Sequence, residues 1–88
     1  MQTFQYTVKD PEGLHARPAG MLAKFAQSCT SSISIEKGGK TADAKRLFAI
    51  MGLAVKQNDV VTFTLEGESE QKDCANLQSF CAQNILGG

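Results

Sequence analysis

Hydrophobic and polar residues alternate in four stretches of the chain, which predicts strands that each bury one face. The expected strands are residues 3–8, 32–37, 40–42 and 60–66. Gly38 and Gly39 form a tight-hairpin signal between the second and third strands. The inward positions of the longer strands are then Phe4, Tyr6, Val8, Ile33, Ile35, Val61, Phe63 and Leu65.

The segments between the strands show helical spacing instead. Helices are predicted over residues 16–27, 46–53 and 70–84, and Ser69 is expected to act as the N-cap of the last one. Their buried stripes are Ala19, Leu22, Ala23 and Ala26 in the first helix and Cys74, Leu77, Phe80 and Cys81 in the last. The order β-α-β-β-α-β-α favours an open-faced α/β sandwich, a single antiparallel sheet with helices on one face. A split βαβ arrangement of the ferredoxin-like kind is the alternative.

Length and charge narrow the choice of function. With 88 residues and a net charge of zero, we expect one domain over residues 1–88 with a modest core and no deep substrate cavity. Neutrality argues against nucleic-acid binding, which generally needs a basic surface. The charge is nevertheless divided, because residues 1–56 hold eight of the nine Lys and Arg and four acids, whereas residues 57–88 hold one Lys and five acids. We therefore expect a cationic, partly apolar face and an acidic half.

The remaining composition predicts neither a metal site nor a membrane segment. Cys29, Cys74 and Cys81 form no C-x-x-C pair and are expected to be small buried hydrophobes. No apolar run approaches the roughly 20 residues that cross a bilayer, and no secretory signal is present, so a cytoplasmic protein is expected.

The most informative stretch is Gly13-Leu14-His15-Ala16-Arg17-Pro18-Ala19, which holds the single histidine of the chain. If His15 caps the first helix, the free backbone amides of Ala16 and Arg17, together with the Arg17 guanidinium, form an anion site beside the imidazole. A neutral imidazole is a nucleophile near pH 7 and, once phosphorylated, a good leaving group. The hypothesis is a phosphoryl acceptor, and the alternative is a histidine that only caps the helix or faces solvent.

The second predicted helix is apolar almost all round. A short helix hides about half of its circumference, so some of Leu47, Phe48 and Met51 should be exposed as a docking surface for proteins. Gly20, Met21 and Lys24 would extend this surface if the first two helices are neighbours. Such a surface suits partners with acidic rims around apolar sockets, whereas a helix inserted deeply into the core is the alternative.

These segments resemble one family over essentially the whole chain. Gly13 to Ala19, Gly39-Lys40-Thr41-Ala42-Asp43-Ala44-Lys45, the apolar short helix and Glu66-Gly67-Glu68-Ser69-Glu70 are similar to HPr, the histidine-containing phosphocarrier of the bacterial phosphoenolpyruvate-dependent sugar phosphotransferase system. The resemblance implies a four-stranded antiparallel sheet of order 1-4-2-3 with three helices.

The resemblance also implies roles for residues and partners. His15 would accept phosphate on Nδ1 from phosphorylated enzyme I and pass it to enzyme IIA domains, with Arg17 steadying the phosphoryl group. Gly20, Lys24, Leu47, Phe48 and Met51 would line the docking face. Such a protein is a carrier and not a stand-alone enzyme, and we expect a monomer that needs no cofactor, binds no nucleic acid and does not insert into a membrane.

One position departs from the family pattern. Many members carry a regulatory serine at the start of the second helix, where this chain has Arg46, which an ATP-dependent serine kinase cannot phosphorylate. No regulatory serine site is therefore expected. The alternative functions left open by this substitution are a regulatory paralogue that acts by docking and a carrier in a phosphorelay that does not serve sugar uptake.

Overall fold

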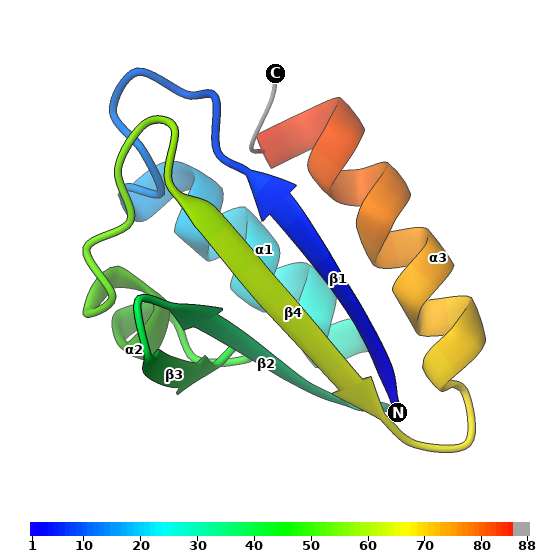
Figure 1. Cartoon of the computed structure of the whole chain (residues 1–88). Helices are drawn as coiled ribbons and strands as arrows, with labels where there is room; N and C mark the ends of the chain where they lie inside the picture. Colours follow the sequence, from blue (N-terminus) through cyan, green and yellow to red (C-terminus); the bar gives the residue numbers. More distant parts are fainter. Residues whose placement is uncertain (86–88) are drawn as a thin grey trace.

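The computed structural model describes residues 1–85, and residue 83 is the last whose side chain it places. Four antiparallel strands form one sheet in the order β1-β4-β2-β3, with the helices packed against it (Figure 1). The sheet order and the three predicted α-helices are confirmed. The elements are β1 (Gln2–Thr7), α1 (Ala16–Ser28), β2 (Ser32–Lys37), β3 (Lys40–Asp43), α2 (Leu47–Met51), β4 (Val60–Glu66), α3 (Glu70–Phe80) and a π-helical turn, η1 (Cys81–Ile85).

The strand alternation predicted from the sequence determines which face of the sheet is buried. In the central strand β4, Phe63 lies opposite Phe4 of β1 on one side and Ile35 of β2 on the other. The rings of Phe4 and Phe63 stack with centroids 5.1 Å apart. The core is formed between this face and the buried faces of the helices, and its large, fully buried side chains are Val8, Leu22, Ile35, Ile50, Val61, Phe63, Leu65 and Leu77.

Two helix predictions need correction. Helix α2 has five residues and not the predicted eight, because Gly52 ends it and Ala54 then turns into a left-handed conformation with φ of 54°. Ser69 occupies the N-cap of α3 but its hydroxyl makes no capping bond. The Glu70 carboxylate instead ties α3 to the segments before it, because it accepts the Gly67 amide at 3.2 Å and pairs with the amino terminus of Met1.

The cysteines behave largely as the sequence predicted. Cys74 and Cys81 are buried, and Cys29 is half-buried. Burial raises the pKa of the Cys81 thiol to about 12, so this thiol stays protonated at neutral pH. In the stretch 1–85, no helix has both the length and the apolar character to span a bilayer.

Candidate functional site

The loop that leads into α1 is held by its own backbone and by the neighbouring loop of residues 52–59. Asp10 folds a turn, because its side-chain Oδ1 accepts the Glu12 amide at 2.8 Å and its carbonyl accepts the Gly13 amide at 2.9 Å. The amide of the buried Leu14 then donates to the Val55 carbonyl at 3.0 Å. The backbone is therefore fixed on both sides of the turn just before His15.

His15 is the N-cap of α1, the position on which the anion site considered in the sequence depends. Its backbone is extended, with φ of −82° and ψ of −170°, and its carbonyl accepts the Ala19 amide at 2.9 Å. The imidazole makes no capping bond, and 36% of the side chain is exposed. Within residues 1–85, the amides of Ala16 and Arg17 have no hydrogen-bond partner. The ring thus lies beside free donors at the positive end of the helix dipole.

Two carboxylates lie against the same imidazole, and the sequence analysis missed both. Nε2 of His15 is 3.5 Å from Oδ2 of Asp10 and 3.8 Å from Oε2 of Glu12. The expectation of a cationic face around His15 is therefore wrong on this side of the ring. The sequence contains a turn pattern that could have indicated this contact. A tight turn at residues 10–13 brings the side chains of Asp10 and Glu12 back toward His15.

The same three side chains are the candidate metal ligands that the described part of the chain brings together. Their ligand atoms lie within 4.8 Å of one another. An imidazole, a half-buried carboxylate and an exposed one at these distances also form an ordinary ion-pair cluster when the imidazole is protonated. No observation at this cluster favours a metal ion over a proton.

The short helix α2 presents an apolar surface to solvent. Phe48 is 83% exposed and Met51 is 38% exposed, whereas Ile50 is fully buried and anchors the helix. The prediction of an exposed apolar helix is confirmed, and the alternative of a deeply inserted core helix is wrong. Leu47 is half-buried at the edge of this surface.

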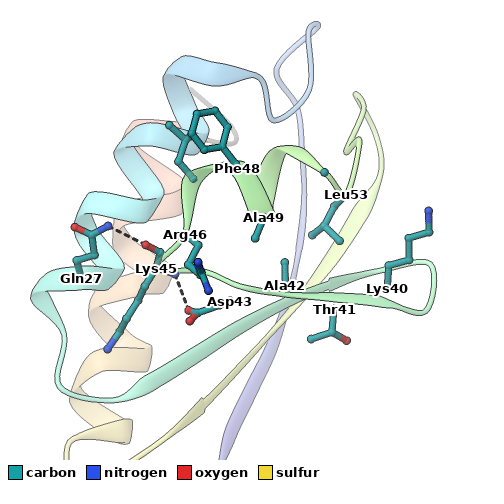
Figure 2. A pocket seen from close by; sticks show the side chains of 12 residues that line it. Gln27, Lys40, Thr41, Ala42, Asp43, Lys45, Arg46, Phe48, Ala49 and Leu53 are labelled. Atoms are coloured by element: carbon teal, nitrogen blue, oxygen red, sulfur yellow. Dashed lines mark hydrogen bonds between the residues drawn. The ribbon is translucent and has the colours of Figure 1, made fainter.

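Helices α1 and α2 are neighbours, which the extended surface required. Gln27 of α1 donates through Nε2 to the Lys45 carbonyl at 2.8 Å, a contact visible in Figure 2. Gly20 is half-buried, and a side chain added to it would find open space. Met21, which is 37% exposed, and Lys24 line a hollow between α1 and α3, floored by the stacked rings of Phe25 and Phe80.

The basic residues beside α2 differ in how free they are. Lys45 is tied to the end of α1, because its Nζ donates to the Cys29 carbonyl at 3.2 Å. Arg46 is the N-cap of α2 and is exposed, without a capping bond from its side chain. It lines an open hollow between α2 and β3 together with Lys40, Thr41 and Asp43 (Figure 2). Arg46 is thus available to a partner, whereas Lys45 is committed to the fold.

Most of the acidic side chains in residues 57–88 form contacts within the molecule. Asp73 is buried and accepts the Ser31 amide at 3.1 Å, Asp59 pairs with Lys37 at 3.3 Å, and Glu70 binds the amino terminus. Of the five acids in residues 57–88, Glu66 and Glu68 are the exposed ones. The charge division along the sequence therefore overstates the acidity of this surface.

Comparison with known proteins identifies the family. The family model described as the PTS HPr component phosphorylation site matches residues 2–83. The chain belongs to the HPr family. HPr of Lysinibacillus sphaericus is 43% identical over 72 residues, which cover 82% of each chain. HPr of Buchnera aphidicola from Acyrthosiphon pisum is 45% identical over 76 residues, covering 84% of this chain and 89% of the relative.

Solved structures agree with this assignment. The histidine-containing phosphocarrier protein of Mycoplasma matches with a TM-score of 0.89 and 28% identity, covering 99% of this chain and all of the other. Crh, the catabolite repression HPr of Bacillus subtilis, matches in a domain-swapped dimer with a TM-score of 0.74 and 34% identity, covering 98% and 99% of the two chains. HPr proteins are phosphocarriers of the phosphotransferase system, and this HPr shares that general role.

A third kind of relative is a segment of a larger protein. The phosphoryl donor subunit of a phosphoenolpyruvate-dependent dihydroxyacetone kinase from Providencia stuartii is 42% identical over 85 residues. The match covers 97% of this chain but only 18% of that subunit. A segment similar to this chain thus occurs in the phosphoryl donor subunit of a kinase.

Proposed function

We propose that this HPr accepts a phosphoryl group on Nδ1 of His15 from phosphorylated enzyme I and gives it to enzyme IIA domains. One observation carries the proposal: a partly exposed imidazole lies at the start of α1 with Nε2 facing two carboxylates and with unpartnered helix amides beside it. The resemblance to HPr implies Nδ1 as the nitrogen that takes the phosphoryl group, and the two carboxylates lie near the other ring nitrogen, Nε2.

The residues that would hold the phosphoryl group are Ala16 and Arg17. Their backbone amides point out of the helix end, where the dipole favours an anion. The exposed Arg17 guanidinium can place two further N–H donors on the phosphoryl oxygens. Positioning and charge stabilisation are most of what phosphoryl transfer requires, so this small site is sufficient for a carrier.

Both partners would dock on the surface formed by α1 and α2. The proposed contacts are Gly20, Met21, Lys24, Leu47, Phe48 and Met51, an apolar centre with cations at its margin. We further propose that the chain acts as one monomeric domain without a cofactor. Arg46, at the position of the family's regulatory serine, leaves no serine-kinase site there and adds an exposed cation to the docking surface.

The direct test is phosphorylation with enzyme I and phosphoenolpyruvate. We expect one acid-labile phosphate per chain, and because His15 is the only histidine, phosphohistidine can arise only there. His15→Ala should abolish the label while remaining folded, since the side chain caps nothing. Absence of label on the wild-type protein would overturn the proposal. Retention of every binding and regulatory activity in His15→Ala would favour the alternative of a regulatory protein that acts by docking.

The Providencia relative supports a second candidate, a carrier whose acceptor is not a sugar transporter. That relative aligns with 97% of this chain, and Arg46 sets the chain apart from HPr proteins regulated at serine. The two candidates differ only in the acceptor. The test offers the phosphorylated protein two acceptors in parallel. One is an enzyme IIA domain, and the other is the phosphoryl donor subunit of a dihydroxyacetone kinase. The acceptor that takes the phosphoryl group faster identifies the pathway.

A further inference from the structure

We infer that Asp10 is a positioning residue for His15, with Glu12 adding charge at the same ring nitrogen. On this inference Asp10 keeps the proton on Nε2, so that the lone pair of the neutral ring is on Nδ1, the proposed nucleophile. The inference rests on the proposed function. It differs from it in assigning a role to two carboxylates that neither the phosphate nor the partners are expected to touch.

The two carboxylates are held very differently. Asp10 is fixed, because Oδ1 accepts the Glu12 amide at 2.8 Å, which aims Oδ2 at the imidazole 3.5 Å away. Its side chain is 31% exposed, against 77% for Glu12, whose carboxylate lies 3.8 Å from Nε2. A fixed, partly shielded carboxylate orients a neighbour better than an exposed one that is screened by water.

The carboxylates face the atom that becomes charged during transfer. When the Nδ1 lone pair attacks phosphorus, the N–P bond forms, the bond between phosphorus and the donor atom of enzyme I breaks and its electron pair stays with enzyme I, and the ring becomes a phosphoimidazolium that still carries Nε2–H. When the phosphoryl group leaves, the N–P electron pair returns to Nδ1 and a neutral imidazole with Nε2–H is restored. No proton moves in either step. Asp10 and Glu12 stabilise the positive ring, and a neutral imidazole is a far better leaving group than an imidazolate.

The other charged residues near His15 in the fold are cations. Arg17 follows His15 by two residues on α1, and the backbone of Lys56 lies against Gly13. Cations disfavour a positive charge on the ring. The nearby acids are thus the groups that favour the protonated Nε2, and they make two distinguishable contributions.

The first test measures the tautomer of the unphosphorylated ring by imidazole ¹⁵N chemical shifts at about pH 8.5, where histidines are ordinarily neutral. In the wild-type protein we expect mainly the Nε2–H form. Asp10→Asn retains an Oδ1 for the Glu12 amide and so turns its NH₂ group toward Nε2, which should shift the population toward Nδ1–H. Asp43→Asn is the matched control, because Asp43 forms the same kind of turn with the Lys45 amide at 2.9 Å on another loop. An unchanged tautomer in Asp10→Asn overturns the inference.

The second test measures transfer once wild-type phosphorylation at His15 has been established. Asp10→Asn should slow transfer in both directions by about tenfold, and Glu12→Gln by about two- to threefold, because removal of a carboxylate from a buried histidine pair costs up to about 10⁴-fold and this pair is partly screened. Equal rates in all variants would overturn the inference and leave the carrier function intact, whereas no labelling of wild type would remove the carrier function itself.

Discussion

The loop before α1 is held by backbone hydrogen bonds and a glycine, whereas helix α2 is held mainly by one buried side chain. At His15 the turn of Asp10 and the bond from Leu14 to Val55 fix the main chain. In α2 only Ile50 is fully buried, and Phe48 extends into solvent. The difference follows from what each region is proposed to do. Phosphoryl transfer needs a fixed nitrogen, whereas docking to several partners needs an apolar surface whose side chains can adjust.

A single loop connects the two regions. Residues 52–59 leave α2 and bring the Val55 carbonyl to Leu14, next to His15. Lys37 clasps this loop by donating to the Ala54 carbonyl at 3.3 Å and pairing with Asp59 at 3.3 Å. The loop also holds Ala54 in the left-handed region, at a φ of 54°, which strains its backbone. The loop therefore joins the end of α2 to the backbone beside His15.

The largest effect on stability should come from removing the anchor of α2. Ile50→Ala creates a cavity at a fully buried position and should lower the free energy of unfolding by about 3 kcal/mol. Phe48→Ala removes a larger side chain that is 83% exposed, and should change stability by less than about 0.5 kcal/mol while slowing transfer to partners. Urea unfolding and a transfer assay on both variants separate the two roles, and a large stability loss in Phe48→Ala would contradict this picture of α2.

The next effect concerns the rigidity of the His15 loop. A Cβ on Gly13 would lie against the Val55 carbonyl and 2.7 Å from Cα of Lys56, at a φ of +71°. Gly13→Ala should cost about 2 to 3 kcal/mol, from steric overlap added to left-handed strain. Gly39→Ala, at a φ of +86° with open space around it, should cost only about 1 kcal/mol. Equal losses in urea unfolding would show that the contact with Val55 does not constrain the loop.

A smaller effect is expected at the margin of the docking surface. Lys24→Glu reverses an exposed charge beside Met21 and should slow transfer about fivefold at low salt, with the difference shrinking as salt is added. Glu68→Lys reverses an exposed charge after β4 and should leave the rate unchanged. Rates measured at several ionic strengths decide the point, and equal sensitivity at both sites would indicate that steering depends on net charge alone.

The smallest effect is a loss of stability in acid. The Lys56 amide and Lys37 lower the pKa of Asp59 in the folded state, and the amino terminus and the Gly67 amide lower that of Glu70. Because both folded pKa values lie below the unfolded ones, their contribution is complete at neutral pH and is lost as pH falls below about 4. Asp59→Asn and Glu70→Gln should flatten this part of the pH dependence of unfolding, whereas Glu68→Gln, at an exposed residue, should not.

Patterns along the chain predicted the site only where the chemistry is local. The sequence placed His15 at the start of α1 because the helical spacing that begins at residue 16 is a pattern among neighbours in the chain. It predicted the exposed face of α2 from an apolar pattern too wide for so short a helix. It missed Asp10 and Glu12, because their effect on His15 depends on how tightly the intervening turn closes. Nor does the sequence show that the Lys45 ammonium donates to the Cys29 carbonyl, because the two residues lie 16 positions apart.

By itself, the sequence determined the strands, the helices, the buried face of the sheet and the phosphocarrier family, because alternation, helical spacing and the His15 motif are local patterns. The tertiary structure decided which charges remain available. Lys37 and Asp59 close a loop, Asp73 binds a backbone amide, and the Asp10 turn places carboxylates against the imidazole. Electrostatic interactions depend on distance in space, and neutral composition gives no information about which charges become neighbours.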